Sequence, residues 1–171
     1  MALPDFPDTS SPEESTSAAP QRSRSRYEPT LVPRLVGTLK SLNARFSELA
    51  GAIERDPSGN ASALEECVRQ FTAVRHIETS WLHPLLEQAV AGDSAARSQL
   101  AELRLVGLIL ARRVQRCFDE LAQAVRAEVL VAVSATRLET ALTKYSNHSE
   151  RAVYPLYELL GSERTEAAEV A

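Results

Sequence analysis

One acidic residue on an apolar helix face has the greatest potential for chemistry in this 171-residue chain. Glu78 continues the spacing of three and four residues that joins Phe71 and Val74 to Leu85. This spacing predicts that its carboxylate faces a protein core, where an unpaired charge is costly. Glu78 therefore needs a proton donor, a cation or a metal ion supplied by other elements.

Few other side chains in the chain could bind a metal or act as a base: it has three histidines and two cysteines. His76 lies two residues before Glu78, so on a helix it faces away from that seam and is expected at the surface. His83 precedes a proline, and we expect it to cover a helix end. Cys67 and Cys117 lie in apolar patterns without metal-ligand spacing, which predicts small core residues with no disulfide.

Four segments with helical apolar spacing are expected to position these residues. The predicted helices begin near Thr30, Ser62, Asp93 and Thr136, and the last ends near Gly161. Asp93 can cap the third helix, and Ser62 and Thr136 can open capping boxes for the second and fourth. The predicted apolar seams of the last three helices include Trp81, Leu103, Val106, Leu110, Ala152 and Leu156.

A repeat with a period of about 70 residues relates the first two helices to the last two. Residues 35–37 recur as 105–107, residues 46–50 recur as 118–122, and residues 81–87 are echoed by 152–158. One hairpin cannot cover its own apolar face, so two copies predict an all-α, up-down-up-down antiparallel four-helix bundle. A proline in each copy predicts a bend near the end of a helix.

The repeat also suggests partners for Glu78. It places Ser149 at the level of Glu78, with Tyr145 and His148 within about one helical turn. The favoured interpretation is a hydrogen-bond network in which Glu78 is bonded to Tyr145 or His148. The first alternative is a mononuclear metal site formed by Glu78, His148 and Tyr145, with His76 as a further candidate ligand. In the second alternative, Glu78 is turned to solvent or contacts a bound ligand.

Both proline-bearing endings resemble those of hemerythrin-like domains, also called HHE cation-binding domains. In that family the second and fourth helices each present a His and then a Glu at fixed distances before an aromatic-Pro-Leu ending. The chain is similar to this family over roughly residues 31–160. Of the equivalent ligand positions only Glu78 keeps the family residue, and the others hold Val74, Tyr145 and Ser149.

The resemblance implies that most iron ligands have been lost. The first and third helices would each supply a His, but near those positions they offer Thr38, Leu39, Leu42, Val106, Leu108 and Leu110. A di-iron centre of this family needs more histidines than the three in this chain. Apolar residues at the positions of the lost ligands predict that the former metal site is filled by packed core side chains. We therefore expect no cofactor, with iron at an atypical site around Glu78 as the alternative.

The composition excludes several function classes. A net charge of −4 argues against a general nucleic-acid binder. No apolar window has the length of a membrane span, and the first residues lack the apolar run of a secretory signal, so a cytoplasmic protein is expected. No nucleophile elbow, phosphate-binding loop, dinucleotide fingerprint or metalloprotease motif is present, and we expect no enzymatic activity. The Ala- and Arg-rich composition is typical of a bacterial chain.

Three regions follow from these patterns. Residues 1–29 are predicted to be a disordered tail, 30–161 the bundle, and 162–171 a frayed tail. The favoured interpretation of the basic run 22–26 is a solvated linker, and contact with an anionic partner is the alternative. The arginines of the third helix are interpreted as a solvated face, with a docking surface for an acidic partner as the alternative.

The predicted function is that of a non-catalytic regulatory or protein-interaction module that binds a protein partner or itself. The alternative is a sensor of iron, oxygen or nitric oxide.

Overall fold

The computed structural model describes residues 27–169, with side chains described as far as Gly161, and within this range it is all-α and contains no strand. Most of the predicted N-terminal tail (1–26) and the last two residues lie outside the described residues. The helical elements are α1 (Leu31–Arg55), the short turn η1 (Ser58–Asn60), α2 (Ala61–Ile77), η2 (Glu78–Leu82), α3 (His83–Ala89), α4 (Ser94–Ala127), α5 (Val131–His148), η3 (Ser149–Val153) and α6 (Tyr154–Glu169).

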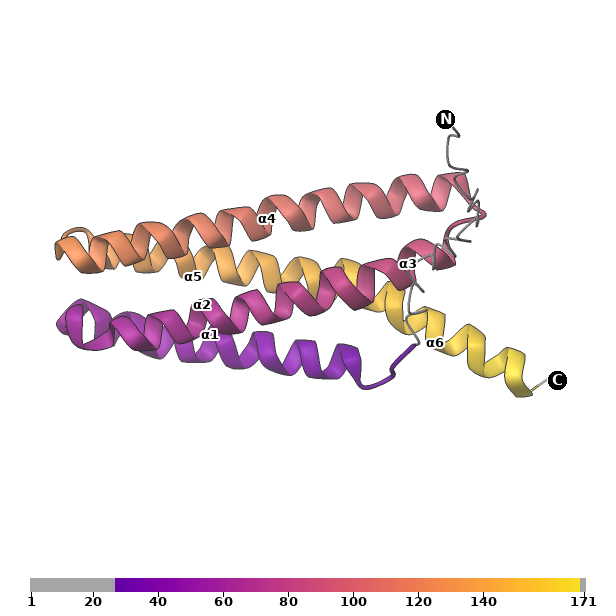
Figure 1. The fold of residues 1–171 in the computed structure, drawn as a ribbon, viewed down its shortest axis with the longest axis horizontal. Helices are drawn as coiled ribbons and strands as arrows, with labels where there is room; N and C mark the ends of the chain where they lie inside the picture. The colour runs from indigo at the N-terminus through magenta and orange to yellow at the C-terminus, as the bar shows by residue number, and fades with distance from the viewer. Residues whose placement is uncertain (1–26, 170–171) are drawn as a thin grey trace, which may run out of the picture.

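These elements form long helical rods that lie side by side (Figure 1). One rod is α1, one is α2 continued by η2 and α3, one is α4, and one is α5 continued by η3 and α6. The α1 helix packs against α2 and α5, and α4 packs mainly against α5. None of the described helices has the length and apolar character needed to cross a membrane.

An aromatic cluster at the centre joins all of the rods. The ring of Phe118 on α4 lies 6.4 Å from that of Phe46 on α1 and 6.0 Å from that of Phe71 on α2. Phe71 in turn makes an edge contact with Tyr145 on α5 at 5.1 Å. Such edge contacts add to the stabilisation from burying the rings. Both Cys67 and Cys117 are buried and free, so the prediction of two small core residues is confirmed.

The α2–α3 rod and the α5–α6 rod share an unusual backbone feature. In η2 the carbonyl oxygen of Glu78 accepts the backbone N–H of His83, five residues on, and in η3 that of Ser149 accepts the N–H of Tyr154. These are π-helical turns, which take one residue more than an α-turn. Each is followed directly by a proline at the second position of the next helix, where a missing N–H is tolerated.

The extra residue changes which side chains face the core. The predicted seam placed Trp81 and Ala152 inside, but Trp81 is 50% exposed and the buried residues are Leu82 and Val153. The prediction for Trp81 was wrong because it assumed an uninterrupted α-helical period. For the same reason Tyr157 is buried in place of Leu156 at the start of α6.

The first helix begins at Leu31, next to the predicted Thr30, and the predicted cap of the third helix is present, but the predicted capping boxes of the second and fourth helices are not. Asp93 caps α4 as predicted, because its carboxylate accepts the N–H groups of Ala95 and Ala96. The capping box at Ser62 was wrong, since α2 begins one residue earlier with no side-chain cap. Thr136 does not begin a helix: α5 starts at Val131, after a reversal with positive φ at two residues.

The last helix also extends further than the sequence suggested. The predicted fourth helix ends near Gly161, but the backbone of α6 continues as a helix to Glu169. Gly161 does not adopt a positive φ, which is the conformation that ends many helices at glycine. The Ala-, Glu- and Arg-containing sequence that follows has good helix propensity.

The first half of α4 is more exposed than its sequence pattern predicted. Val106 was assigned to the seam but is 45% exposed, and Leu103 and Leu110 are only partly buried. The reason is the light packing between α4 and the α2–α3 rod. Figure 1 also shows α6 running away from the first half of α4. The predicted seam residues in the second half of α4, Cys117, Leu121 and Val125, are buried.

Candidate functional site

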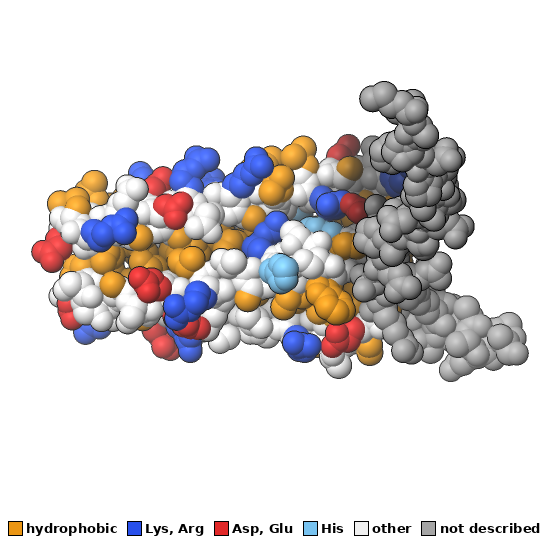
Figure 2. Space-filling view, in the orientation of Figure 1, with side chains coloured by type: hydrophobic (Ala, Val, Ile, Leu, Met, Phe, Trp, Pro, Cys, Tyr) orange, Lys and Arg blue, Asp and Glu red, His pale blue; other side chains and the backbone are white. Residues whose placement is uncertain are grey.

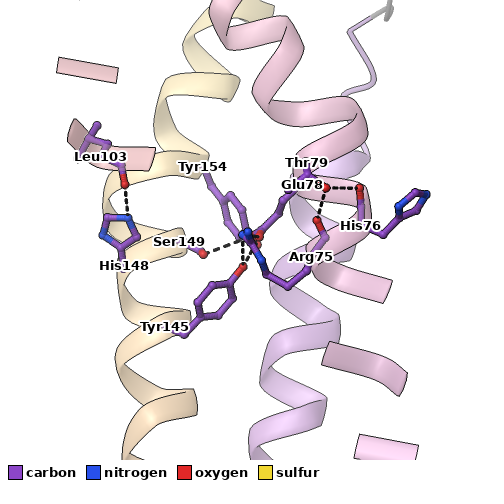
Figure 3. A network of polar contacts seen from close by, with 9 residues as sticks. All are labelled: Arg75, His76, Glu78, Thr79, Leu103, Tyr145, His148, Ser149 and Tyr154. Atoms are coloured by element: carbon purple, nitrogen blue, oxygen red, sulfur yellow. Dashed lines mark hydrogen bonds and ion pairs between the residues drawn. The ribbon is translucent and has the colours of Figure 1, made fainter. Parts of the chain in front are cut away.

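The carboxylate of Glu78 is the centre of a buried polar network (Figure 3). Only 2% of the residue is exposed. Its Oε1 accepts hydrogen bonds from the hydroxyls of Tyr154 at 2.8 Å and Ser149 at 3.2 Å. Its Oε2 accepts one from Arg75 Nη1 at 2.9 Å and a short one from the Tyr145 hydroxyl. The hydrogen bond between Glu78 and Tyr145 that the sequence predicted is therefore present.

The π-helical turns explain why these side chains meet. On an α-helix, residues five apart point in different directions, whereas the longer π-turn brings them towards one face. Ser149 and Tyr154 are the first residue of η3 and the residue directly after it, and both are buried and reach the same oxygen of Glu78. Arg75 approaches from the preceding turn of the helix that carries Glu78.

The ionisation of the network is set by burial and by the charge of Glu78. Burial and the nearby carboxylate both raise the pKa values of Tyr145 and Tyr154 far above that of an exposed tyrosine. Both phenols are therefore protonated and act as donors. Burial acts to lower the pKa of Arg75, but Tyr145 and Glu78 outweigh it and the pKa is raised, so the guanidinium stays charged. Its carbon Cζ lies 5.7 Å from the Tyr145 ring centroid, within cation–π range.

The histidines do not converge on Glu78. The Nε2 atom of His148 lies 3.0 Å from the carbonyl oxygen of Leu103 on α4, and Figure 3 shows its ring turned away from the carboxylate. Gly107 permits this approach, because a Cβ at that position would lie 3.3 Å from Nε2. His76 is exposed as predicted, with its Nδ1 atom 3.4 Å from the Ser80 hydroxyl.

As arranged, these side chains do not fit an iron centre. A carboxylate offers about four lone-pair positions, and each of the four hydrogen bonds to Glu78 uses one. Tyr145 would have to lose the proton that it donates to Glu78, and His148 would have to leave Leu103. In the part of the chain that the structure describes, no three His, Cys, Asp or Glu side chains are grouped to hold a metal ion.

Two members of the network were missed by sequence reasoning. Arg75 was overlooked because a charged residue next to an apolar seam usually lies in solvent. Tyr154 was noticed only as part of the proline-bearing ending, because an uninterrupted helix would have placed it away from Ser149. A signal was available, since a proline at the same place in both copies of the repeat indicates a local change of helical period.

His83 occupies the position after η2 that Tyr154 occupies after η3. The sequence suggested that it covers a helix end, yet it is buried, with 8% of the residue exposed. Burial lowers the pKa of its imidazole to about 4, although the Glu78 carboxylate acts in the opposite direction. His83 is therefore neutral at neutral pH, and its ring lies outside the network around Glu78.

The chain was compared with models of protein families, with curated proteins and with solved structures, and none of these comparisons found a match.

Proposed function

We propose that this protein is a hemerythrin-like, up-down-up-down antiparallel bundle made of a duplicated helical hairpin, and that it acts as a non-catalytic regulatory or protein-interaction module. The proposal holds that the di-iron site of the ancestral fold has been replaced by a hydrogen-bond network. The observation that carries it is the complete set of donors around the Glu78 carboxylate.

The donor set supports this proposal through its energetics. A buried carboxylate is tolerated when each lone pair has a partner, and hydrogen bonds to a charged group are stronger than neutral ones. Three of the four donors to Glu78 are neutral hydroxyls, and the fourth is a guanidinium. The hydroxyls solvate the Glu78 carboxylate, and Arg75 supplies the one positive charge beside it. Under this proposal the bundle is stable without a metal ion.

The surface of α4 supports the interaction role. Leu105, Val106, Leu108 and Ile109 are 57%, 45%, 38% and 56% exposed and follow one another on the half of α4 that packs lightly. Figure 2 shows hydrophobic side chains reaching the surface along this side of the molecule. Clustered exposed apolar residues are typical of protein contact surfaces. The proposed partner is a protein, either another chain or a second copy of this one, in the cytoplasm and not a nucleic acid.

The metal content of the purified protein tests the proposal that a hydrogen-bond network has replaced the di-iron site. The protein is purified from iron-supplemented cells, and its iron and its near-ultraviolet and visible spectrum are measured. The proposal expects a colourless protein with iron far below one atom per chain. Near-stoichiometric iron with a charge-transfer band would contradict it and would favour the sensor function. Glu78→Ala and His148→Ala would then show whether these residues hold the metal.

Sedimentation tests self-association through α4. The proposal in its self-association form expects the wild-type protein to dimerise with increasing concentration and Ile109→Glu to remain a monomer. Val133→Glu is the matched control, because Val133 is also about half exposed but lies on α5. A monomeric wild-type protein, or equal weakening by both variants, would contradict self-association through this face.

A further inference from the structure

A groove lies between the α2–α3 rod and α4, beside the Glu78 network. It has a volume of about 280 Å³. Arg75, Thr79 and His83 line one wall, and Ala101, Arg104, Leu105 and Leu108 of α4 line the other. It continues at each end into further hollows of about 330 and 240 Å³ that share lining residues with it. The groove exists because α4 packs lightly against the α2–α3 rod.

His83 is the buried polar group that opens on this groove. Only 8% of the residue is exposed, and among the described residues its ring has no hydrogen-bond partner. No fully buried side-chain nitrogen or oxygen of the described residues lacks a partner, so the polar edge of the His83 ring must reach the groove. The neutral ring has one N–H donor and one acceptor. The ring nitrogens that face the groove are therefore available to donate a hydrogen bond to a ligand there, or to accept one from it.

The charges around the groove select the kind of ligand. The guanidinium groups of Arg75 and Arg104 line it, and none of the described residues that line this central part is acidic. The acidic Glu87, which pairs with Arg104, lines the adjoining hollow of about 330 Å³. The recorded contacts of these arginines to Glu78, Tyr145 and Glu87 all use one nitrogen, Nη1. A guanidinium has five N–H donors, so both arginines retain donors for an anion. The remaining wall, Ala101, Leu105 and Leu108, is apolar and suits a hydrocarbon body.

We infer that this groove binds a small organic carboxylate, whose head contacts His83 and Arg104 and whose apolar body lies on Leu105 and Leu108. Arg75 contributes positive charge at the same wall and links the groove to Glu78. This inference goes beyond the proposed interaction role and does not rest on it. The ligand head is bound outside the Glu78 network, which stays intact.

Titration with octanoate, followed by NMR of the histidine ring protons, tests this inference. The ring signals of His83 are expected to shift and saturate, while those of His76 and His148, which lie outside the groove lining, stay in place. Octanol lacks the charge and acetate lacks the apolar body, so each is expected to bind at least about tenfold more weakly than octanoate.

Substitutions in α4 distinguish binding of octanoate in the groove from non-specific binding of an amphiphile elsewhere on the protein. Arg104→Gln is expected to weaken octanoate about tenfold, because it removes a charged hydrogen-bond donor. Arg116→Gln is the matched control on the same helix, outside the groove lining, and is expected to leave affinity unchanged. Both arginines are exposed enough for the variants to fold, which the NMR spectrum reports directly. An unmoved His83 signal, or equal affinities for the two variants, would overturn the inference.

Discussion

The two π-helical segments have the same backbone but opposite chemistry. In both, a carbonyl oxygen accepts an N–H five residues on, and a proline follows. The rod of η2 supplies the charges, Arg75 and Glu78, whereas the rod of η3 supplies the neutral hydroxyls of Tyr145, Ser149 and Tyr154. A single buried carboxylate can therefore be stabilised by neutral hydroxyl donors from the equivalent segment, together with one cation beside it.

The residues that follow each π-turn show a second difference. Tyr154 points to Glu78 and is sealed in the core, whereas His83 points to the groove beside α4. The packing of α4 explains this difference, because α4 lies closely against α5 but only lightly against the α2–α3 rod. The same backbone position is thus part of the core in one half and part of a surface groove in the other.

The largest expected effect comes from exchanging the equivalent residues Glu78 and Ser149 for alanine. Glu78→Ala leaves Arg75 and three hydroxyls without their acceptor and is expected to lower the free energy of unfolding by about 3 kcal/mol. Ser149→Ala removes one neutral donor and is expected to lower it by about 1 kcal/mol. Urea denaturation of both variants measures the difference. Equal losses would contradict the unequal roles of the two segments.

Removing a phenol hydroxyl is expected to have the next largest effect. Tyr145→Phe and Tyr154→Phe each leave one lone pair of Glu78 without a donor and are expected to lower the free energy of unfolding by about 2 kcal/mol. In a Glu78→Gln background both losses should become smaller, because the acceptor is no longer charged. A double-mutant cycle measures this coupling. Coupling near zero would show that the phenols do not stabilise Glu78.

The pH dependence of stability distinguishes His83 from Tyr154. The folded pKa of His83, about 4, lies below the ordinary value of 6.5, so the unfolded chain binds more protons between these values. Stability from this group is therefore complete above pH 6.5 and is lost as the pH falls towards 4. Across this pH range we expect the free energy of unfolding of the wild type to fall by about 2 kcal/mol more than that of His83→Gln. This difference is smaller than the full pKa shift of His83 would give, because water in the groove weakens the effect of burial. Parallel pH profiles would contradict this.

The smallest expected effect concerns Gly37 and Gly107, which occupy equivalent places in the sequence repeat. Both lie inside helices, where alanine is favoured by about 0.5–1 kcal/mol. A Cβ at Gly37 meets open space, so Gly37→Ala should raise the free energy of unfolding by that amount. A Cβ at Gly107 would lie 3.3 Å from His148 Nε2, so Gly107→Ala should gain less. Thermal unfolding of both variants compares them, and a larger gain at Gly107 would contradict the close approach of His148.

The sequence was sufficient to predict those parts of the molecule that follow a regular period. The all-α class, the buried Cys67 and Cys117, the cap at Asp93 and the burial of Glu78 all follow from local rules, and the structure contains them. The exposure of Trp81 and the inward position of Tyr154 were missed, because one inserted residue in a π-turn rotates every residue after it and only the two equivalent prolines indicated that insertion. The exposed half of α4 could not be predicted either, because exposure there depends on how far α4 stands from α2 and α3.

The most direct test of the central claim, that four donors stabilise Glu78 in place of a metal ion, is urea unfolding with and without iron. The wild-type protein is unfolded anaerobically with a chelator and then with excess ferrous iron. We predict equal free energies of unfolding, since a fully hydrogen-bonded carboxylate has no lone pair to offer. A rise with iron of about 2 kcal/mol or more, abolished in Glu78→Gln, would mean that the native state binds iron at this site and would contradict the claim.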